Sequence, residues 1–324
     1  MEEGRAHGVR VVDVYNETGL RMTVLADRCM DIVDLSFRGV NIGYRNACGV
    51  VAPAYYDAVG NGWLRGFTAG FLTTCGLCNI GAPCVTDGIE HGQHGRISYT
   101  PAREFSARVE SNENEARAIL SGTMNESVMF GENLDLCRKI TMEGTKNQIT
   151  IRDRICNRGF RKESYMQLYH FNLGYPFLSE DCELYLPHDA PTPRDTWAAA
   201  HIKEVAQIES PRQTQEMCYY YTLPPQGDTA YTGIFNRVLG IGLIMTFDKK
   251  PLKCFTQWKN LSQGAYVLGL EPGTNFVEGR DREQKRSGLP TLDPQSWEEH
   301  CVQIEFFENR DAFLKKWKER NFEC

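Results

Sequence analysis

His170 stands in a segment whose pattern fits a general acid or base. Strand alternation places His170 and Asn172 on the same face as Met166 and Leu168, so the imidazole points into the apolar interior or into a cleft lined by it. Either position limits contact of the imidazole with bulk water. The segment alone leaves two interpretations open, a catalytic histidine and a hydrogen-bonded histidine of the core.

A second candidate group is Glu271, which follows an apolar strand and directly precedes Pro272-Gly273. We expect a turn at Pro272-Gly273, with Glu271 at the strand end on the face of Val267 and Gly269. Gly269 would leave open surface where a ligand could approach the backbone. Partial burial would raise the pKa of the carboxyl toward the range useful for proton transfer, whereas the alternative is a surface ion pair.

A third group has side chains of the types that bind zinc. His91 and His94 stand three residues apart, and Cys75, Cys78 and Cys84 precede them. The spacing is poor, because no second pair of cysteines or histidines follows. The segment around Cys75 is typical of a buried strand, in which cysteine acts as a small apolar residue. We therefore expect no metal.

The elements that must position these groups are strands. Residues 148–157 alternate most cleanly, with Ile149, Ile151 and Ile155 on one face and polar side chains on the other. Long helices between strands are missing, so we expect an all-β protein with mostly antiparallel sheets and one short terminal helix, at residues 310–321, on a sheet edge. Further strands are expected at residues 9–15, 21–25, 30–38, 118–123, 134–141, 164–173, 217–223, 240–247, 265–270 and 301–306.

The chain contains no internal repeat, low-complexity tract or linker rich in proline or serine. We therefore expect a single domain over residues 1–324. The least regular stretches are residues 47–70, 80–95 and 187–212, which are rich in Gly, Pro, His, Trp and Tyr. Long loops in a compact β-protein are usually functional or disordered, and the aromatic side chains favour function.

Features of several other function classes are absent. The sequence has no G-x-G-x-x-G after a strand, no phosphate-binding G-x-x-x-x-G-K-[ST] and no G-x-S-x-G, so no nucleotide or redox cofactor is implied. The formal net charge is -6 and the pI is about 5.7, without a block of Lys or Arg. We expect neither nucleic acid nor membrane as a partner, and a neutral small molecule as substrate.

The residues at the start of the chain, Met1 to Arg5, are acidic and polar, where a secretory signal needs a basic stretch and then an apolar run. No apolar run elsewhere in the sequence is long enough to span a bilayer. Twelve cysteines are dispersed through the chain without an export signal. This combination favours reduced thiols and a cytoplasmic protein.

Five segments, in this order along almost the whole chain, resemble the aldose 1-epimerase or galactose mutarotase-like family, in particular a poorly characterised epimerase-like branch. The resemblance implies a large antiparallel β-sandwich that binds a sugar in an open cleft on one sheet. The segments are Asp27-Arg28-Cys29-Met30-Asp31-Ile32, Thr73-Thr74-Cys75-Gly76-Leu77, His94-Gly95-Arg96-Ile97-Ser98, Tyr169-His170-Phe171-Asn172-Leu173 and Leu270-Glu271-Pro272-Gly273-Thr274.

The resemblance also implies a mechanism that interconverts the anomers of a free aldose without a metal. Glu271 matches the glutamate that takes the proton from the anomeric hydroxyl, and His170 matches the histidine that protonates the ring oxygen. The ring then opens, the C1–C2 bond rotates and the ring recloses on the other carbonyl face. We expect the acid and the base a ring-width apart, held by strands from different parts of the chain.

Five further residues are candidates for substrate binding. His94 matches the family histidine that hydrogen-bonds the sugar, and Arg65 is chosen as the arginine that reaches a ring hydroxyl. Arg96 and Asn172 are candidates in the matched segments. Trp258 could be an aromatic platform for a sugar face, and the alternative is a buried tryptophan of the core.

Two departures from the family pattern keep other sugar reactions open. Well-studied mutarotases have Asn-His-Ser-Tyr-Phe-Asn-Leu, whereas here two fewer residues separate His170 from the phenylalanine. The aspartate that those enzymes use on substrate hydroxyls has no match. The alternatives are isomerisation or epimerisation next to a carbonyl on the same scaffold, and carbohydrate binding without catalysis. The sugar and the oligomeric state stay open.

Overall fold

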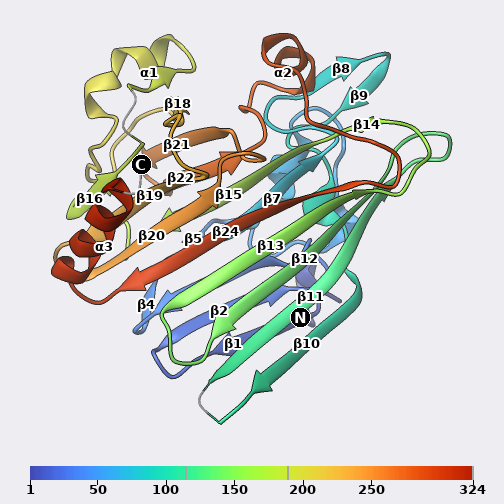
Figure 1. Ribbon diagram of the computed structural model, residues 1–324. Coiled ribbons are helices and arrows are strands. Elements are labelled where there is room, and N and C mark those ends of the chain that lie inside the picture. The colour runs from blue at the N-terminus through green and yellow to red at the C-terminus, as the bar shows by residue number, and fades with distance from the viewer. Residues whose placement is uncertain (114, 188–189, 323–324) are drawn as a thin grey trace.

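The computed structural model describes residues 1–113, 115–187 and 190–322, and strands in antiparallel sheets dominate them (Figure 1). This confirms the predicted fold class. The largest sheet has eight strands, in the order β10 (Arg103–Ser111), β11 (Ala116–Ser127), β12 (Asn133–Glu143), β13 (Gln148–Asn157), β24 (Trp297–Phe307), β20 (Ile241–Asp248), β19 (Thr229–Asn236) and β16 (Cys182–Tyr185).

A six-stranded sheet carries both candidate catalytic residues. Its order is β17 (Thr192–Pro193), β18 (Met217–Thr222), β21 (Cys254–Ser262), β22 (Ala265–Gly273), β15 (Met166–Gly174) and β7 (Leu72–Leu77). A four-stranded sheet precedes both, with β1 (Val11–Tyr15), β2 (Leu20–Leu25), β3 (Asp31–Phe37) and β4 (Val40–Asn41). Three two-stranded pairs complete the sheets, β5 (Tyr44–Arg45) with β6 (Ala69–Gly70), β8 (Cys84–Thr86) with β9 (Ile89–His91), and β14 (Glu163–Ser164) with β23 (Thr291–Leu292).

Side-chain alternation explains how the sheets stack. On β13, which has the predicted bounds, Ile149, Ile151 and Ile155 are buried, and Arg152 and Arg154 are exposed. A strand with one apolar face must bury that face. The eight-stranded sheet and the six-stranded sheet bury their apolar faces against each other. Their inner faces join one large cluster of buried apolar residues.

A buried polar cluster fixes β15 against the eight-stranded sheet. Arg138 on β12 pairs with Asp153 on β13 at 2.7 Å and with Asp31 on β3 at 3.3 Å. The Tyr169 hydroxyl on β15 donates a hydrogen bond to Asp153 at 2.7 Å. Because Tyr169 points into the sandwich, the next side chain, His170, points out of the opposite face of its sheet. Local alternation therefore aims the candidate histidine away from the sandwich core.

Three α-helices are present in the described residues: α1 (Thr196–Ala200), α2 (Arg280–Arg286) and α3 (Arg310–Phe322). Helix α3 was predicted, but it packs on the outer face of the eight-stranded sheet rather than on an edge. Phe313 and Trp317 cluster there with Phe235, Ile244 and Phe307. None of the described helices has the length and apolar character that crossing a membrane requires.

Some elements escape sequence analysis because their patterns are weak or mixed. Strand β10 is a largely exposed edge strand without an apolar face, and α1 and α2 are too short to show a helical period. Strands β19 and β21 were not predicted either. Helix α1 lies within the predicted loop at residues 187–212, of which residues 188–189 lie outside the described residues.

Candidate active site

A pocket of about 620 Å³ opens over the six-stranded sheet. Strands β15, β18, β21 and β22 supply its floor, and the turn η3 (Gly62–Gly66) and the segments around His94 and Glu278 supply its walls. Helices α1 and α2 and the β8–β9 hairpin lie together at the top of Figure 1, on this side of the molecule. The pocket therefore joins segments that are far apart in the sequence, as the predicted site requires.

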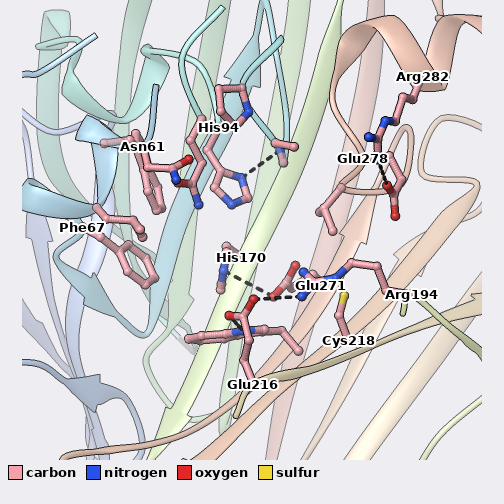
Figure 2. Close-up of a pocket in the computed structure, with 18 of the residues that line it drawn as sticks. Asn61, Phe67, His94, His170, Arg194, Glu216, Cys218, Glu271, Glu278 and Arg282 are labelled. Carbon is pink, nitrogen blue, oxygen red and sulfur yellow. Dashed lines mark hydrogen bonds and ion pairs between the residues drawn. The ribbon is translucent and has the colours of Figure 1, made fainter. Parts of the chain in front are cut away.

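His170 and Glu271 lie side by side on the pocket floor (Figure 2). They come from the adjacent strands β15 and β22, in which Phe171 pairs with Leu270. His170 Nε2 is 3.3 Å from Glu271 Oε1, although the two groups are not aligned as a hydrogen bond. The expected separation of a ring width is therefore wrong, because neighbouring strands place the two side chains in direct contact.

Burial sets the protonation of this pair. His170 is 5% exposed and Glu271 is 2% exposed. Desolvation lowers the pKa of His170 to about 4. Desolvation, and then the negative charge of Glu216, raise the pKa of Glu271 well above its usual value, and Arg194 acts in the opposite direction. Both shifts favour the uncharged groups, so a carboxyl that can donate a proton touches an imidazole that can accept one.

His170 Nδ1 and Glu271 Oε1 are buried atoms without a hydrogen-bond partner among the described residues. Burying such polar atoms without a partner costs free energy, and because both residues line the pocket this cost falls at its floor.

Aromatic rings form one wall of the pocket. The ring of His94 packs 4.6 Å from that of Trp63 and 5.7 Å from that of His170, and Phe67 lies 5.2 Å from His170. The backbone N–H of Gly81 donates a hydrogen bond to His94 Nδ1 at 3.2 Å. His94 Nδ1 is therefore the acceptor, and Nε2 carries the ring proton. Burial, and then His170, lower the pKa of His94 well below its usual value, so His94 is a neutral donor.

Charged side chains cross-link the opposite side of the pocket (Figure 2). Arg194 donates to Glu216 Oε1 at 2.8 Å, and Trp258 Nε1 donates to Glu216 Oε2 at 2.9 Å. The indole of Trp258 is half-buried and meets the His170 ring edge-on at 5.3 Å. Trp258 therefore lines the pocket, which argues against the alternative of a core tryptophan. Nearby, Arg282 pairs with Glu278 at 3.1 Å.

Strand β22 continues through the predicted turn. Pro272 pairs with Phe255 on β21, and Gly273 pairs with Cys254, so the turn after Glu271 is wrong. Proline has no N–H to donate to a neighbouring strand, and the pairing of β22 with β15 skips Glu271 and Pro272, so β21 alone holds this part of the strand. The space over Gly269 is also occupied differently from expectation: it is filled by the Glu271 carboxyl and by Trp258.

Three predicted binding residues do not line this pocket: Arg65, Asn172 and Arg96. Arg65 is 79% exposed on its side chain and pairs with Asp57 at 3.4 Å, because the η3 turn directs it outward while Trp63 points inward. Asn172 is buried beneath the pocket, where its amide donates to the backbone oxygens of Ala69 and His170. Their proposed contacts with substrate are therefore not supported by the geometry.

Arg96 faces a second cavity instead. His94 and Gly95 both adopt left-handed backbone conformations, with φ of 56° and 69°. The resulting bend directs His94 into the first pocket and Arg96 into the other cavity, where it pairs with Glu126 at 3.0 Å. In a regular strand, His94 and Arg96 would lie on one face. The sequence therefore predicted both at the same site, and only the backbone bend sends Arg96 to the other cavity.

The residues considered for zinc do not form a metal site. Cys75 is fully buried in β7, as predicted, and Cys84 pairs with His91 across the β8–β9 hairpin. His91 Nε2 is 2.7 Å from the Thr86 hydroxyl. Across the part of the chain that the structure describes, no three His, Cys, Asp or Glu side chains are placed to hold a metal ion together.

Sequence analysis missed five charged residues of the pocket, Arg194, Asp195, Glu216, Glu278 and Arg282. Arg194 and Asp195 lie in the irregular stretch at residues 187–212 that was expected to be functional. The others have no local signal, because an exposed charged residue beside a strand or on a short helix is common on any surface. Only the approach of β17, β18 and α2 to the pocket brings them to it.

Comparison with known structures and families agrees with this architecture. A protein from Klebsiella pneumoniae provisionally named an aldose 1-epimerase matches with a TM-score of 0.93 at 22% identity, covering 100% of this chain and 86% of that one. A galactose mutarotase-like protein from Clostridium acetobutylicum matches with a TM-score of 0.64 at 11% identity, covering 93% and 99%. The aldose epimerase homologue from C. elegans matches with a TM-score of 0.59 at 15% identity, covering 94% and 100%.

At these identities the structural matches show a shared fold, the galactose mutarotase-like sandwich that was predicted. A comparison with curated proteins gives no match. A family model described as "Domain of unknown function (DUF4432)" matches residues 6–306. The chain therefore belongs to the DUF4432 family and has the fold of aldose 1-epimerases and galactose mutarotase-like proteins.

Proposed function

We propose that this protein is an aldose 1-epimerase that interconverts the anomers of a free sugar with Glu271 and His170 as its acid–base pair. The observation that carries the proposal is the contact of His170 Nε2 with Glu271 Oε1 at 3.3 Å on the floor of the pocket. Ring opening moves one proton from the anomeric hydroxyl and delivers one to the ring oxygen. Both oxygens are bonded to the same carbon, so an adjacent pair of groups can reach both.

Glu271 and His170 together hold one proton, which is enough for both proton transfers of ring opening. Burial favours the protonated Glu271 and the neutral His170. Transfer of that proton across the contact gives a carboxylate, which accepts the proton of the anomeric hydroxyl, and an imidazolium, which protonates the ring oxygen. Reclosure reverses both transfers. The site then returns to its starting state without exchanging a proton with solvent.

The remaining pocket residues match the needs of a polyhydroxylated ring. Aromatic side chains such as Trp63 and Trp258 offer apolar surface to the C–H faces of a sugar. The Nε2–H of His94, and the charged groups of Arg194 and Glu216, offer donors and acceptors for hydroxyls. The structural relatives named as epimerases and mutarotase-like proteins add support at the level of fold.

Mutarotation of freshly dissolved aldoses, followed by polarimetry or NMR exchange, tests the proposal. Glu271→Gln and His170→Gln should each lower the rate of the active sugar by roughly 100-fold or more. Glu283→Gln and His300→Gln are matched controls, because both remove a buried group that does not line the pocket, and they should keep most of the rate.

Failure of the wild-type protein to accelerate any aldose in a broad panel would overturn the proposed activity. A rate that survives Glu271→Gln would overturn the role of Glu271. NMR of the products also separates the alternative reactions, because isomerisation or epimerisation next to a carbonyl changes the sugar away from C1. Saturable binding without any turnover would indicate a carbohydrate-binding protein instead.

A further inference from the structure

Thr256 lies directly opposite Glu271 on the neighbouring strand. Strands β21 and β22 form a hairpin in which these two residues pair. Directly opposite residues of an antiparallel pair share a face of the sheet, with their Cβ atoms about 4.5–5.5 Å apart. Thr256 is fully buried, and its Oγ1 has no hydrogen-bond partner among the described residues. A buried hydroxyl with an unused hydrogen bond therefore stands beside the proposed catalytic carboxyl.

The other side chains around Thr256 on this face are poor acceptors. Across the sheet, Thr256 pairs with Tyr220 on β18, whose own hydroxyl is bonded to a glutamate further away. Along β21, the residues two positions away are Cys254 and Trp258. A thiol is a weak acceptor, and an indole N–H is a donor only. Of the neighbours of Thr256 on this face, Glu271 is therefore the one with strong acceptor oxygens.

The carboxyl of Glu271 also has few polar neighbours. The residues two positions away along β22 are Gly269 and Gly273, which have no side chain. His170 lies on one side of Glu271, at 3.3 Å, and Thr256 lies on the other. A proton transfer from Glu271 to His170 leaves a buried carboxylate, which is costly unless donors surround it. The imidazolium supplies a donor on one side, and the hydroxyl of Thr256 can supply the donor on the other.

We propose that Thr256 is a positioning residue whose hydroxyl donates a hydrogen bond to the Glu271 carboxylate once the Glu271 proton has moved to His170. While Glu271 keeps its proton, the hydroxyl stays unpaired. Thr256 does not line the pocket, so it acts on the reaction through Glu271 and not by contact with the sugar. The effect on rate rests on the proposed function, whereas the hydrogen bond to the ionised Glu271 does not.

Thr73 provides a matched control on the opposite side of the acid–base pair. It lies on β7, where it pairs with His170 as Thr256 pairs with Glu271. Both threonines are buried, but the Thr73 hydroxyl already donates to the backbone oxygen of Ala69 at 2.8 Å. Replacing either threonine removes a hydroxyl beside the pair, but only the change at Thr256 removes the proposed donor to Glu271.

The other ionisable groups that act on Glu271 or respond to its charge stay the same when either threonine is replaced. They are His170, Glu216, Arg194 and the thiols of Cys75 and Cys218. Burial raises the pKa of both thiols, so both stay uncharged. A change in the titration of Glu271 that occurs only without the Thr256 hydroxyl therefore reports that hydroxyl.

The test is a pH titration of the Glu271 carboxyl by ¹³C NMR in the full-length protein labelled at glutamate, with Glu271→Gln to assign the signal. Thr256→Val should move the midpoint to higher pH by about one unit, because loss of a donor disfavours the carboxylate. Thr256→Ala should act in the same direction, which gives a second reading with a smaller side chain. Thr256→Ser and Thr73→Val should both keep the wild-type midpoint.

Mutarotation of the same samples measures the effect on rate. Thr256→Val should lower the rate roughly 10-fold, and Thr256→Ser should keep most of it. An unchanged midpoint in Thr256→Val and Thr256→Ala would overturn the proposal, and so would an equal shift in Thr73→Val. Absence of mutarotation in the wild-type protein would overturn the proposed function instead, and the NMR midpoints would still decide whether Thr256 binds the carboxylate.

Discussion

The carboxyl of Glu271 lies over the backbone of Gly269, two residues earlier on β22. A Cβ atom at Gly269 would overlap with Glu271 Oε1 and would lie 3.1 Å from the Cβ of Trp258. Residues i and i+2 of a strand share a face, so only a glycine here lets the carboxyl fold down beside His170. The position of the proposed acid–base pair thus depends on a missing side chain.

Gly269→Ala should therefore lower activity without unfolding the protein. The added methyl group pushes away the flexible end of Glu271, and a misplacement of about 1 Å can cost about 100-fold in rate. Because Gly269 has an ordinary strand conformation, the variant should lose only about 1 kcal/mol of unfolding free energy. Kinetics and urea unfolding of the same sample check both effects.

The double variant Gly269→Ala with Glu271→Gln serves as the control. If the alanine acts through Glu271, the double variant should be little slower than Glu271→Gln alone. Additive losses would show that Gly269 affects the rate by another route.

The rate should fall on both sides of a broad pH range. His170 has a pKa of about 4, below its ordinary value, so the imidazole gains a proton and stops accepting one only as the pH falls through about 4. Glu271 has a raised pKa, so the carboxyl loses its proton only above the usual range for glutamate. Initial rates with the uncatalysed rate subtracted should show both limbs. An acidic limb near pH 6.5, where an ordinary histidine titrates, would contradict the burial of His170.

Glu216→Gln should shift the alkaline limb toward lower pH. The negative charge of Glu216 contributes to the raised pKa of Glu271, and glutamine removes that charge while keeping an oxygen for the Trp258 N–H. Glu278→Gln is the matched control, because Glu278 also lines the pocket but instead accepts a hydrogen bond from Tyr220. The pH profiles of both variants give the comparison, and equal shifts would contradict the specific role of Glu216.

Asp153→Asn should destabilise the sandwich strongly. Asp153 accepts hydrogen bonds from Arg138, Tyr169 and Gln167 in a fully buried cluster. Loss of the carboxylate leaves Arg138 with incomplete compensation, and breaking a buried ion pair costs about 3–5 kcal/mol. Urea unfolding measures the change in free energy.

Glu299→Gln is the control for this prediction, since it removes the exposed ion pairs of Glu299 with Arg152 and Arg154 on the same sheet. Exposed pairs contribute about 1 kcal/mol or less. Similar losses in the two variants would show that burial does not decide the strength of these pairs.

Local patterns were sufficient to predict the fold class and the faces of its strands. Period-two alternation predicted β13 with its observed bounds. It also grouped His170 with Met166 and Leu168 on one face, but only the structure showed that this face is turned away from the sandwich interior. The alternation is a local property of an extended chain, because successive side chains point to opposite sides whatever the strand later pairs with. The burial of Glu271 likewise follows the apolar run before it.

The tertiary structure alone decided which side chains meet. The contact between His170 and Glu271 depends on the register of β15 with β22, and register is set by strand pairing and long-range packing rather than by either segment. Long-range packing likewise explains why Arg194 lines the pocket and Arg65 points away from it. The positions of loops and edge strands are not determined by their own residues alone. The sequence by itself determined which side chains share a face of each strand. The folded chain determined which side chains of different strands meet, as His170 Nε2 and Glu271 Oε1 do at 3.3 Å.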